Sequence, residues 1–207
     1  MRTKALLVAA AFAAGLATSM AQNVYSLNVV GYYNITVPAN GFALIANQLN
    51  TTNNNLSALL PSVPDGTQFF KFTGTSWESA TYDALDERWD RDFSLNPGEG
   101  GMIKNNSSSP MTITFVGEVL QGSLTNPIPA GYAVRSSMVP VAGTVAQLGF
   151  PAADGDQVFK FTGSGWASAT YDGLDERWDQ DLNIAVGEAF FSRKNQAVEW
   201  VRNFTVE

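Results

Sequence analysis

A chain of 207 residues with 12 basic and 19 acidic residues has a formal net charge of −7, and it contains neither His nor Cys. The missing residue types exclude the commonest general base, the usual Ser-His and Cys-His nucleophile pairs, structural zinc sites and disulfides. The negative charge argues against nucleic acid as a partner, because binding to phosphate backbones depends on Lys and Arg. It suits a protein that stays soluble outside the cell.

The start of the chain predicts a signal peptide. Arg2 and Lys4 precede an apolar run over 5–16, and the small residues Ser19 and Ala21 follow it, an arrangement that signal peptidases recognise. Cleavage after Ala21 leaves 10 basic residues against 19 acidic ones, a net charge of −9. No later apolar run reaches the roughly 20 residues of a membrane helix. We therefore expect a secreted or cell-surface protein without a membrane span.

The residues after the signal peptide predict strands. Apolar and β-prone residues over 24–37 favour one long strand, with a bend or bulge at Gly31. A turn over 38–41 leads into the short apolar segment 42–46, which is typical of a buried strand.

One short segment predicts a helix. Leu56, Leu59 and Leu60 have the i, i+3, i+4 spacing of a helical face, and Pro61 ends the pattern. The Asn residues over 53–55 are candidates for the N-cap, because their side chains accept hydrogen bonds from free backbone N–H groups.

A β-hairpin follows the helix. Phe70 and Phe72 alternate with Lys71 as in a strand, and a turn over 73–76 leads into a second strand over 77–82. Downstream we expect an acidic loop, another turn and two further strands, over 83–92, 97–100, 102–104 and 111–119.

The hairpin and its acidic loop occur twice in the chain. The segments 68–92 and 157–181 are identical at 19 of 25 positions, which indicates one structural unit used twice. We therefore predict an all-β protein with a signal peptide over 1–21 and two tandem homologous antiparallel modules over 22–120 and 121–207. Each module is expected to be a β-sandwich or a barrel-like unit with one short helix.

The two ends of the chain match the junction between the modules. The strand over 24–37 matches 115–128, where module one runs into module two, and 203–207 match 114–118. The N-terminal strand of one copy could then complete an open sheet edge of another copy, which would build head-to-tail chains. The alternative is that this strand folds back into its own module.

Five segments of the chain carry a resemblance to a known family: VYSLNVVGYYN, GFALIAN, KFTG-x-x-W, LNPGEGGMI and TITFVGEV. Together they resemble a group of uncharacterised secreted bacterial proteins built from one or more β-rich modules. The resemblance extends over residues 22–207 and implies export and an all-β fold, and it implies no catalytic residue. In module two the segment 185–188, AVGE, replaces the Pro-Gly-Glu-Gly turn of module one.

The acidic loop of each hairpin is a candidate calcium site. Calcium takes about six to eight oxygen ligands, of which clustered carboxylates supply several. The candidate metal ligands are Asp83, Asp86, Asp90 and Asp92, and in the second copy Asp172, Asp175, Asp179 and Asp181. The alternative is a solvated loop with Arg–Asp pairs. A glycosidase needs one carboxylate pair across a cleft, so carboxylates packed in one short duplicated loop argue against an enzyme.

Aromatic residues of the repeated segment are candidate ligand contacts, because exposed aromatic faces can stack on sugar rings. The candidates are Trp89 beside Arg88 and Trp178 beside Arg177. The alternative is that these aromatic side chains fill the core. Trp77 and Tyr82 have opposite parity on one strand, so they point to opposite faces of the sheet. At most one of the two therefore belongs to the core.

Two functional hypotheses follow. The first is an exported noncatalytic structural or cell-surface protein that associates with itself by strand donation. The alternative is an extracellular module that binds a polysaccharide or the cell wall, with calcium as the one conceivable cofactor.

Overall fold

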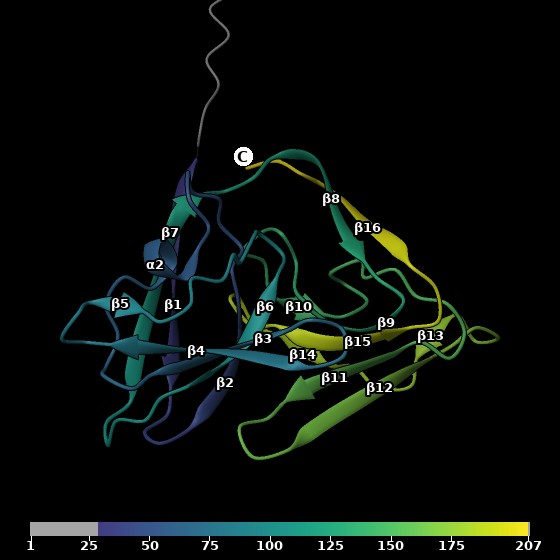
Figure 1. Ribbon diagram of the computed structural model, residues 1–207. Helices are drawn as coiled ribbons and strands as arrows, with labels where there is room; N and C mark the ends of the chain where they lie inside the picture. The colour runs from purple at the N-terminus through teal and green to yellow at the C-terminus, as the bar shows by residue number, and fades with distance from the viewer. Residues whose placement is uncertain (1–28, 207) are drawn as a thin grey trace, which may run out of the picture.

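The computed structural model describes residues 29–206. The predicted signal peptide and the first residues of the predicted N-terminal strand lie outside this range. Within it, the chain is built from antiparallel strands and one four-residue helix, which confirms the predicted all-β class (Figure 1). No helix in this part of the chain is long and apolar enough to cross a membrane.

Module one consists of a five-stranded antiparallel sheet and a two-stranded ribbon. The sheet has the strand order β2-β6-β3-β4-β5. Its strands are β2 (Phe42–Ala46), β3 (Gln68–Phe72), β4 (Trp77–Asp83), β5 (Arg88–Trp89) and β6 (Gly100–Lys104). The ribbon pairs β1 (Val30–Val37) with β7 (Met111–Glu118).

Module two repeats this arrangement. Its five-stranded sheet has the order β13-β12-β11-β15-β9. The strands are β9 (Gly131–Arg135), β11 (Gln157–Phe161), β12 (Trp166–Asp172), β13 (Arg177–Trp178) and β15 (Phe190–Lys194). The ribbon pairs β8 (Gly122–Ile128) with β16 (Val198–Phe204), and a short extra pair joins β10 (Gly143–Thr144) to β14 (Asn183–Ile184).

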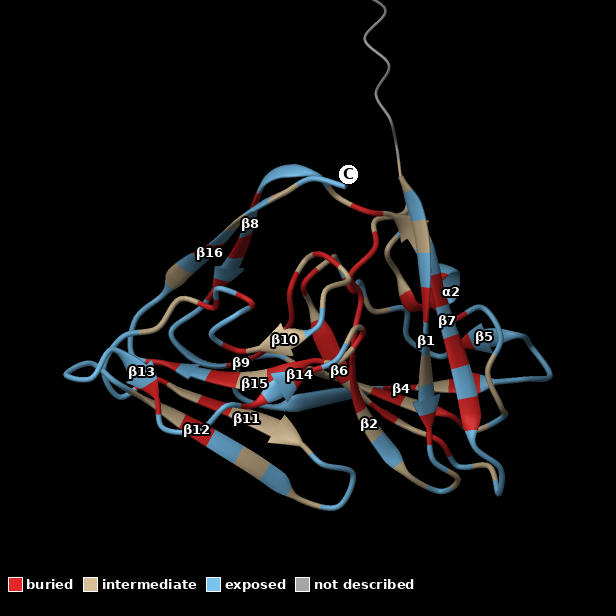
Figure 2. Ribbon diagram, turned by 180° about the vertical axis from the view of Figure 1, so that it is seen from behind, coloured by how far each residue is buried: buried red, intermediate tan, exposed pale blue. Residues whose placement is uncertain are grey.

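The ribbon of each module packs on one face of its sheet, and strand alternation decides which side chains meet there. In module one Phe69, Ala80 and Ile103 form a buried cluster with Ile113 and Phe115 of the ribbon. Figure 2 shows the matching alternation of buried and exposed bands along β7. The corresponding cluster of module two contains Val158, Ala169 and Phe190 of the sheet with Ile128 and Trp200 of the ribbon. Each large apolar side chain buried in this way contributes roughly 1.5–3 kcal/mol to the folded state.

The described part of the N-terminal strand pairs within its own module. β1 lies antiparallel to β7 from Val30 opposite Glu118 to Val37 opposite Met111. Of the two arrangements considered from the sequence, this is the one in which the strand folds back into its own module.

The two ribbons differ slightly from the match made in the sequence. Val37 faces Met111 in module one, and Ile128 faces Val198 in module two. Val37 and Ile128 are repeat equivalents, because each precedes a Pro-Ala pair. Their strand partners, Met111 and Val198, are therefore equivalent as well. The predicted match of 203–207 with 114–118 is therefore wrong by two residues, because the loop before β16 is two residues shorter.

The predicted helix is present in module one as α2 (Leu56–Leu59), with Leu56 and Leu59 buried. Asn55 occupies the N-cap position without a side-chain cap. The carboxylate of Asp92 takes this role instead and accepts the backbone N–H of Ser57 at 2.8 Å. The prediction of a helix in each module is wrong for module two, since the described residues there contain none and the equivalent segment, 145–149, forms turns.

The two modules meet through matching elements around an approximate twofold axis. The backbone N–H of Ala46 donates to the carbonyl of Gly187 at 2.8 Å, and the N–H of Ser136 donates to the carbonyl of Gly98 at 2.9 Å. Gly187 is the repeat equivalent of Gly98, 89 residues further on. Isolated bridges repeat the same symmetry, since Ile45 pairs with Glu188, and Arg135 pairs with Glu99.

Side chains between these strands seal the contact between the modules. Leu44, Ala46, Val134 and Ala189 form a buried apolar cluster. The side-chain amide of Gln48 binds two residues of module two, because it donates to the Ser136 hydroxyl and accepts the backbone N–H of Gly187. The modules therefore pack as one unit.

The turns at the contact need glycine. Gly98 and Gly187 have positive φ angles of 88° and 76°, which side chains with a Cβ rarely adopt. A Cβ on Gly98 would lie 2.4 Å from Nδ2 of Asn126, and a Cβ on Gly187 would lie 2.6 Å from the ring of Tyr33. Each turn of one module thus approaches the ribbon of the other too closely for a side chain.

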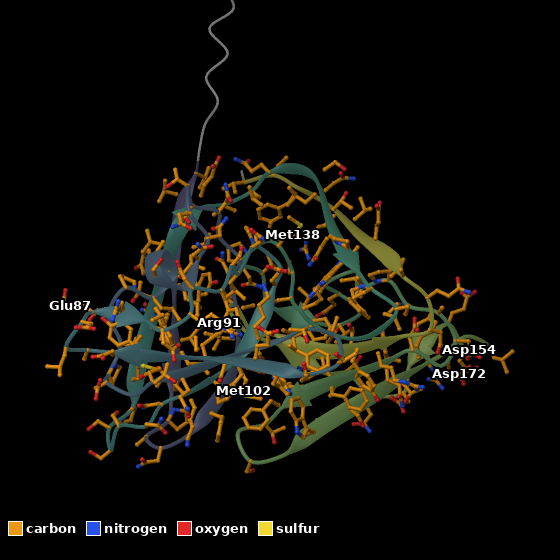
Figure 3. All side chains as sticks on the ribbon, viewed as in Figure 1. Glu87, Arg91, Met102, Met138, Asp154 and Asp172 are labelled. Carbon is orange, nitrogen blue, oxygen red and sulfur yellow. The ribbon has the colours of Figure 1, made fainter. Side chains whose placement is uncertain are left out.

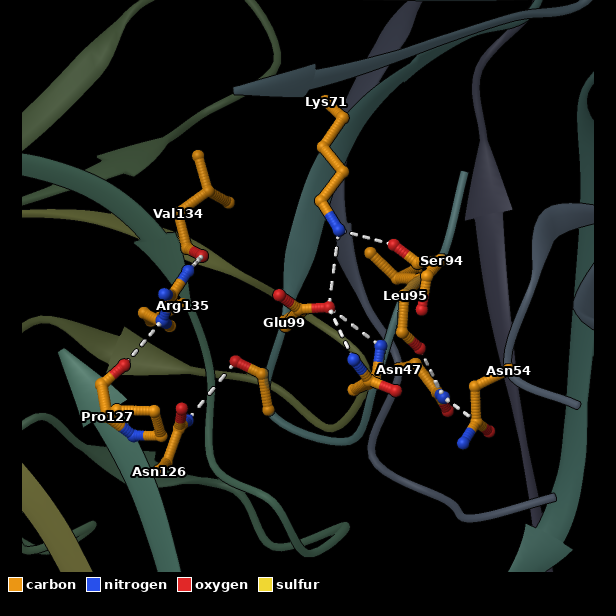
Figure 4. Close-up of polar contacts among 12 residues, drawn as sticks. Asn47, Asn54, Lys71, Ser94, Leu95, Glu99, Asn126, Pro127, Val134 and Arg135 are labelled. Carbon is orange, nitrogen blue, oxygen red and sulfur yellow. Dashed lines mark hydrogen bonds and ion pairs between the residues drawn. The ribbon is translucent and has the colours of Figure 1, made fainter. Parts of the chain in front are cut away.

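Polar contacts hold both turns in the same shape. Figure 4 shows Lys71 with its ammonium between the carbonyl of Ser94 and the carboxylate of Glu99, 3.3 Å away. Lys160 and Glu188 form the equivalent pair in module two at 3.0 Å. The two turn sequences therefore build one geometry. Nearby, burial lowers the pKa of Arg135, and the charge of Glu99 raises it in part.

Candidate functional site

The acidic loops use their carboxylates to shape their own turns. Asp83 accepts the backbone N–H groups of Leu85 and Asp86, and Asp86 forms an ion pair with Arg88 at 2.8 Å. The second copy repeats these contacts with Asp172, Asp175 and Arg177. The two loops lie at opposite ends of the molecule, as the labels of Glu87 and Asp172 in Figure 3 show.

The remaining predicted metal ligands also have other partners or lie apart. Asp90 and Asp179 each accept the backbone N–H of a Thr on the neighbouring strand. Asp92 caps α2, whereas Asp181 lies exposed. Within residues 29–206 no three acidic residues gather as possible metal ligands. The structure therefore gives the calcium prediction no support, because turn formation has spread these carboxylates around the loop.

The predicted exposure of Trp89 and Trp178 is wrong. Their exposed fractions are 6% and 9%, and each packs edge-on against a Tyr of the preceding strand at 5.5 and 5.3 Å. The short strands β5 and β13 fold these indole rings inward onto the core of their modules. Arg88 and Arg177 are exposed as predicted, and their guanidinium groups are paired with the acidic loops.

The exposed aromatic residues lie instead on the outer face of the two sheets. Trp77 and Trp166 are 39% and 48% exposed, and Phe42 and Tyr132 are 37% and 45% exposed. Tyr82, in contrast, is buried. The parity argument for β4 is therefore confirmed, with Trp77 on the outer face and Tyr82 in the core.

Strand pairing arranges this outer face in rows that both modules share. One row of module one runs Leu44, Met102, Phe70, Ser79, and its equivalent in module two runs Val134, Phe191, Phe159, Ser168. A second row is more polar and runs Phe42, Lys104, Gln68, Thr81 in module one and Tyr132, Arg193, Gln157, Thr170 in module two. A third row pairs Phe72 with Trp77 and Phe161 with Trp166.

We call the ring-bearing and thioether part of these rows the aromatic face. It consists of Phe42, Phe70, Phe72, Trp77 and Met102 in module one, and of Tyr132, Phe159, Phe161, Trp166 and Phe191 in module two. Phe191 lies at its centre, with ring centroids 5.2 Å from Phe72, 5.5 Å from Trp77 and 5.6 Å from Trp166. The rings of both repeated hairpins therefore meet at one side chain.

The aromatic face is hollowed where the two modules join. A groove of about 570 Å³ is lined by residues of both modules, among them Trp77, Trp166, Met102 and Phe191. A smaller hollow of about 270 Å³ adjoins it on module two, between Tyr132 and Trp166. Trp166 lines both hollows, so the two form one interrupted surface that can take an extended ligand.

The sequence contained a signal for this face. In the segment FFKF, Phe70 and Phe72 share a parity that Phe69 does not, and the same pattern recurs at Phe159 and Phe161. A sheet with large apolar residues on both faces needs cover on both, and the ribbon covers only one. What the sequence did not reveal was that the uncovered faces of the two modules adjoin.

No protein-family model, curated protein or solved structure matches this chain. The resemblance to uncharacterised secreted bacterial proteins therefore stays a prediction.

Proposed function

We propose that this protein is an exported, noncatalytic binding protein whose aromatic face holds an extended extracellular polysaccharide. The observation that carries the proposal is the pair of half-exposed indole rings, Trp77 of module one and Trp166 of module two, that line one shared groove. Sugar rings present one face of C–H groups, which packs on an aromatic ring, while their hydroxyl groups need polar partners.

The aromatic face has polar partners along its border. Gln68 and Lys104 follow Phe42 in the polar row of module one, and Gln157 and Arg193 follow Tyr132 in module two. Arg193 donates to the Gln157 side chain at 3.1 Å, so this pair is already oriented before a ligand arrives. A face with rings in the middle and a row of amide and cationic groups in each module suits a polymer of repeated units.

The absence of His and Cys from the sequence supports a noncatalytic role. The aromatic face also lacks carboxylates facing each other across the groove, since none of the groove-lining residues is acidic. Hydrolysis of a glycosidic bond requires such a pair.

Retention on insoluble polysaccharides, followed by titration with soluble oligosaccharides, tests the proposal. The double variant Trp77→Ala, Trp166→Ala should bind roughly 5- to 150-fold more weakly, because an aromatic contact is worth about 0.5–1.5 kcal/mol beyond its area. The matched control is Leu85→Ala with Leu174→Ala, since both Leu side chains are 95% exposed on the distant acidic loops. Unchanged retention of the folded Trp double variant would overturn the proposal.

Self-association by strand exchange is a second candidate. Its support is the two-stranded ribbon, in which β1 has β7 as its one strand partner among the described residues. An identical β1 from another copy could take the same place, as in a domain swap. Light scattering of the mature protein over a wide concentration range tests this candidate, and a monomer at every concentration rejects it.

A further inference from the structure

Helix α2 covers the Tyr82–Trp89 pair of module one and occupies its polar groups. The Tyr82 hydroxyl donates to the carbonyl of Pro61 at 2.9 Å, and Nε1 of Trp89 donates to the carbonyl of Leu60 at 3.0 Å. The carboxylate of Asp92 caps the helix. All three polar groups at this end of the sheet therefore have partners from the α2 segment.

Module two has the same three side chains without the helix. Tyr171, Trp178 and Asp181 are the repeat equivalents of Tyr82, Trp89 and Asp92. The segment over 144–149 forms a tight turn, in which the N–H of Leu148 donates to the carbonyl of Thr144 at 2.9 Å. Of the residues that the structure describes, none accepts a hydrogen bond from the Tyr171 hydroxyl or Nε1 of Trp178, and none donates to the Asp181 carboxylate.

The three residues that carry these unpaired groups, Tyr171, Trp178 and Asp181, line one pocket. It has a volume of about 540 Å³, within the roughly 300–1,000 Å³ of small-molecule sites. Tyr171, Trp178 and Phe150 supply its rings, and the rings of Phe150 and Trp178 lie 6.3 Å apart. Arg177 and Asp181 also line it. Nε1 of Trp178 has no partner among the described residues. No buried side-chain nitrogen or oxygen of those residues is unpaired, so this N–H is open to solvent and to a ligand.

We propose that this pocket binds a single neutral sugar ring. The indole N–H of Trp178, the Tyr171 hydroxyl and the guanidinium of Arg177 donate hydrogen bonds to ring hydroxyl oxygens. The Asp181 carboxylate accepts hydrogen bonds from ring hydroxyl groups. The aromatic rings pack on the C–H face of the sugar. Three carboxylates, from Glu176, Asp179 and Asp181, line the pocket against one guanidinium, so an anionic ligand is repelled.

The inferred site lies apart from the aromatic face. Trp178 belongs to β13 and pairs with Tyr171 near the end of β12. The module-two residues that line the groove are Phe161 of β11, Trp166 at the start of β12 and Phe191 of β15 (Figure 1). The two lining sets share no residue. The inference therefore goes beyond the proposed function, and the two can be tested separately.

Titration of the full mature protein with glucose, galactose, mannose and N-acetylglucosamine, each followed by NMR and tryptophan fluorescence, tests the pocket. Saturable binding of at least one of these sugars is expected, with a dissociation constant on the order of 1 mM. The double variant Tyr171→Phe, Asp181→Asn removes one hydroxyl and one charge, and it should weaken that binding about tenfold or more. The matched control Tyr82→Phe, Asp92→Asn makes the same changes in module one and should leave the affinity unchanged.

Three outcomes would overturn the inference. The first is no saturable binding of any of the four sugars, and the second is equal affinity in the module-two double variant. The third is loss of monosaccharide binding in Trp77→Ala, Trp166→Ala while the pocket variant keeps its affinity, because this would place the sugar on the aromatic face. If Trp77→Ala, Trp166→Ala loses polysaccharide retention but keeps monosaccharide binding, the result supports the pocket and shows that the two sites are separate.

Discussion

Module one covers its Tyr–Trp pair with a helix, whereas module two leaves the same pair open beside a pocket. The residues of the pair and of its acidic loop belong to the segment that is identical at 19 of 25 positions. The difference comes from the divergent segment before it, which forms α2 in one module and turns over 145–149 in the other. Identical side chains therefore differ in which of their polar groups are paired, because different segments pack on them.

A second difference lies where the loop before the last ribbon strand leaves the sheet. Module one buries Asn105 there, and its amide donates to backbone carbonyls of Val37, Pro38 and Ser109. Module two buries Lys194 at the equivalent position, where it pairs with the buried carboxylate of Asp156. A neutral hydrogen-bonding site in one module has become an ion pair in the other.

Removal of one partner of this ion pair should have the largest effect. Lys194→Met leaves the Asp156 carboxylate buried without a counter-charge, so we expect the free energy of unfolding to fall by about 3–5 kcal/mol. Urea denaturation of the variant and the wild type measures this loss. The double variant Lys194→Asn, Asp156→Thr copies Asn105 and Thr67 of module one, and it should be more stable than Lys194→Met. A double variant less stable than the single one would contradict this account.

The paired tryptophans should respond unequally to the same change. Trp89→Phe removes a buried hydrogen bond to the carbonyl of Leu60, whereas Trp178→Phe removes none within the described part of the protein. Both variants lose similar ring area, so the difference isolates the hydrogen bond. We expect Trp89→Phe to be more destabilising than Trp178→Phe by about 1 kcal/mol, measured by denaturant titration. Equal losses would mean that α2 does not engage Trp89 in solution.

The smallest difference is expected at the last Asp of each acidic loop. Asp92→Ala removes the cap of α2 and should cost about 1 kcal/mol. Asp181→Ala removes an exposed carboxylate without a hydrogen-bond partner among residues 29–206 and should change stability by less than about 0.5 kcal/mol. Thermal unfolding of the two variants side by side measures both values, and a larger loss at Asp181 would reverse the assignment of the cap.

Prediction from the sequence was best where a local pattern decides the structure. The hairpin over 68–82, the helical spacing of Leu56 and Leu59 and the opposite orientations of Trp77 and Tyr82 were all predicted correctly. Such features depend on strand alternation and helical period, which neighbouring residues set. The predicted exposure of Trp89 and Trp178 was wrong. A strand of two residues is too short for the alternation of side chains to show which one faces the core.

The candidate sites were harder to predict than the fold. The aromatic face depends on the apposition of two modules, and the parity of Phe70 and Phe72 does not reveal which surface the second module approaches. The module-two pocket depends on an absent helix, while the sequence pattern favoured one helix in each module. Arg177 and Trp178 were predicted as ligand contacts and Asp179 and Asp181 as metal ligands, and all four line the module-two pocket.

By itself, the sequence determined the strand content, the duplication and the alternation of side chains along each strand, because these follow from local residue order. Tertiary structure alone decided which faces became the core, which became the groove between the modules, and which polar groups lost their partners. The physical reason is that burial and hydrogen-bond satisfaction depend on segments far apart in the chain. Two nearly identical segments can therefore have one shape and two different surroundings.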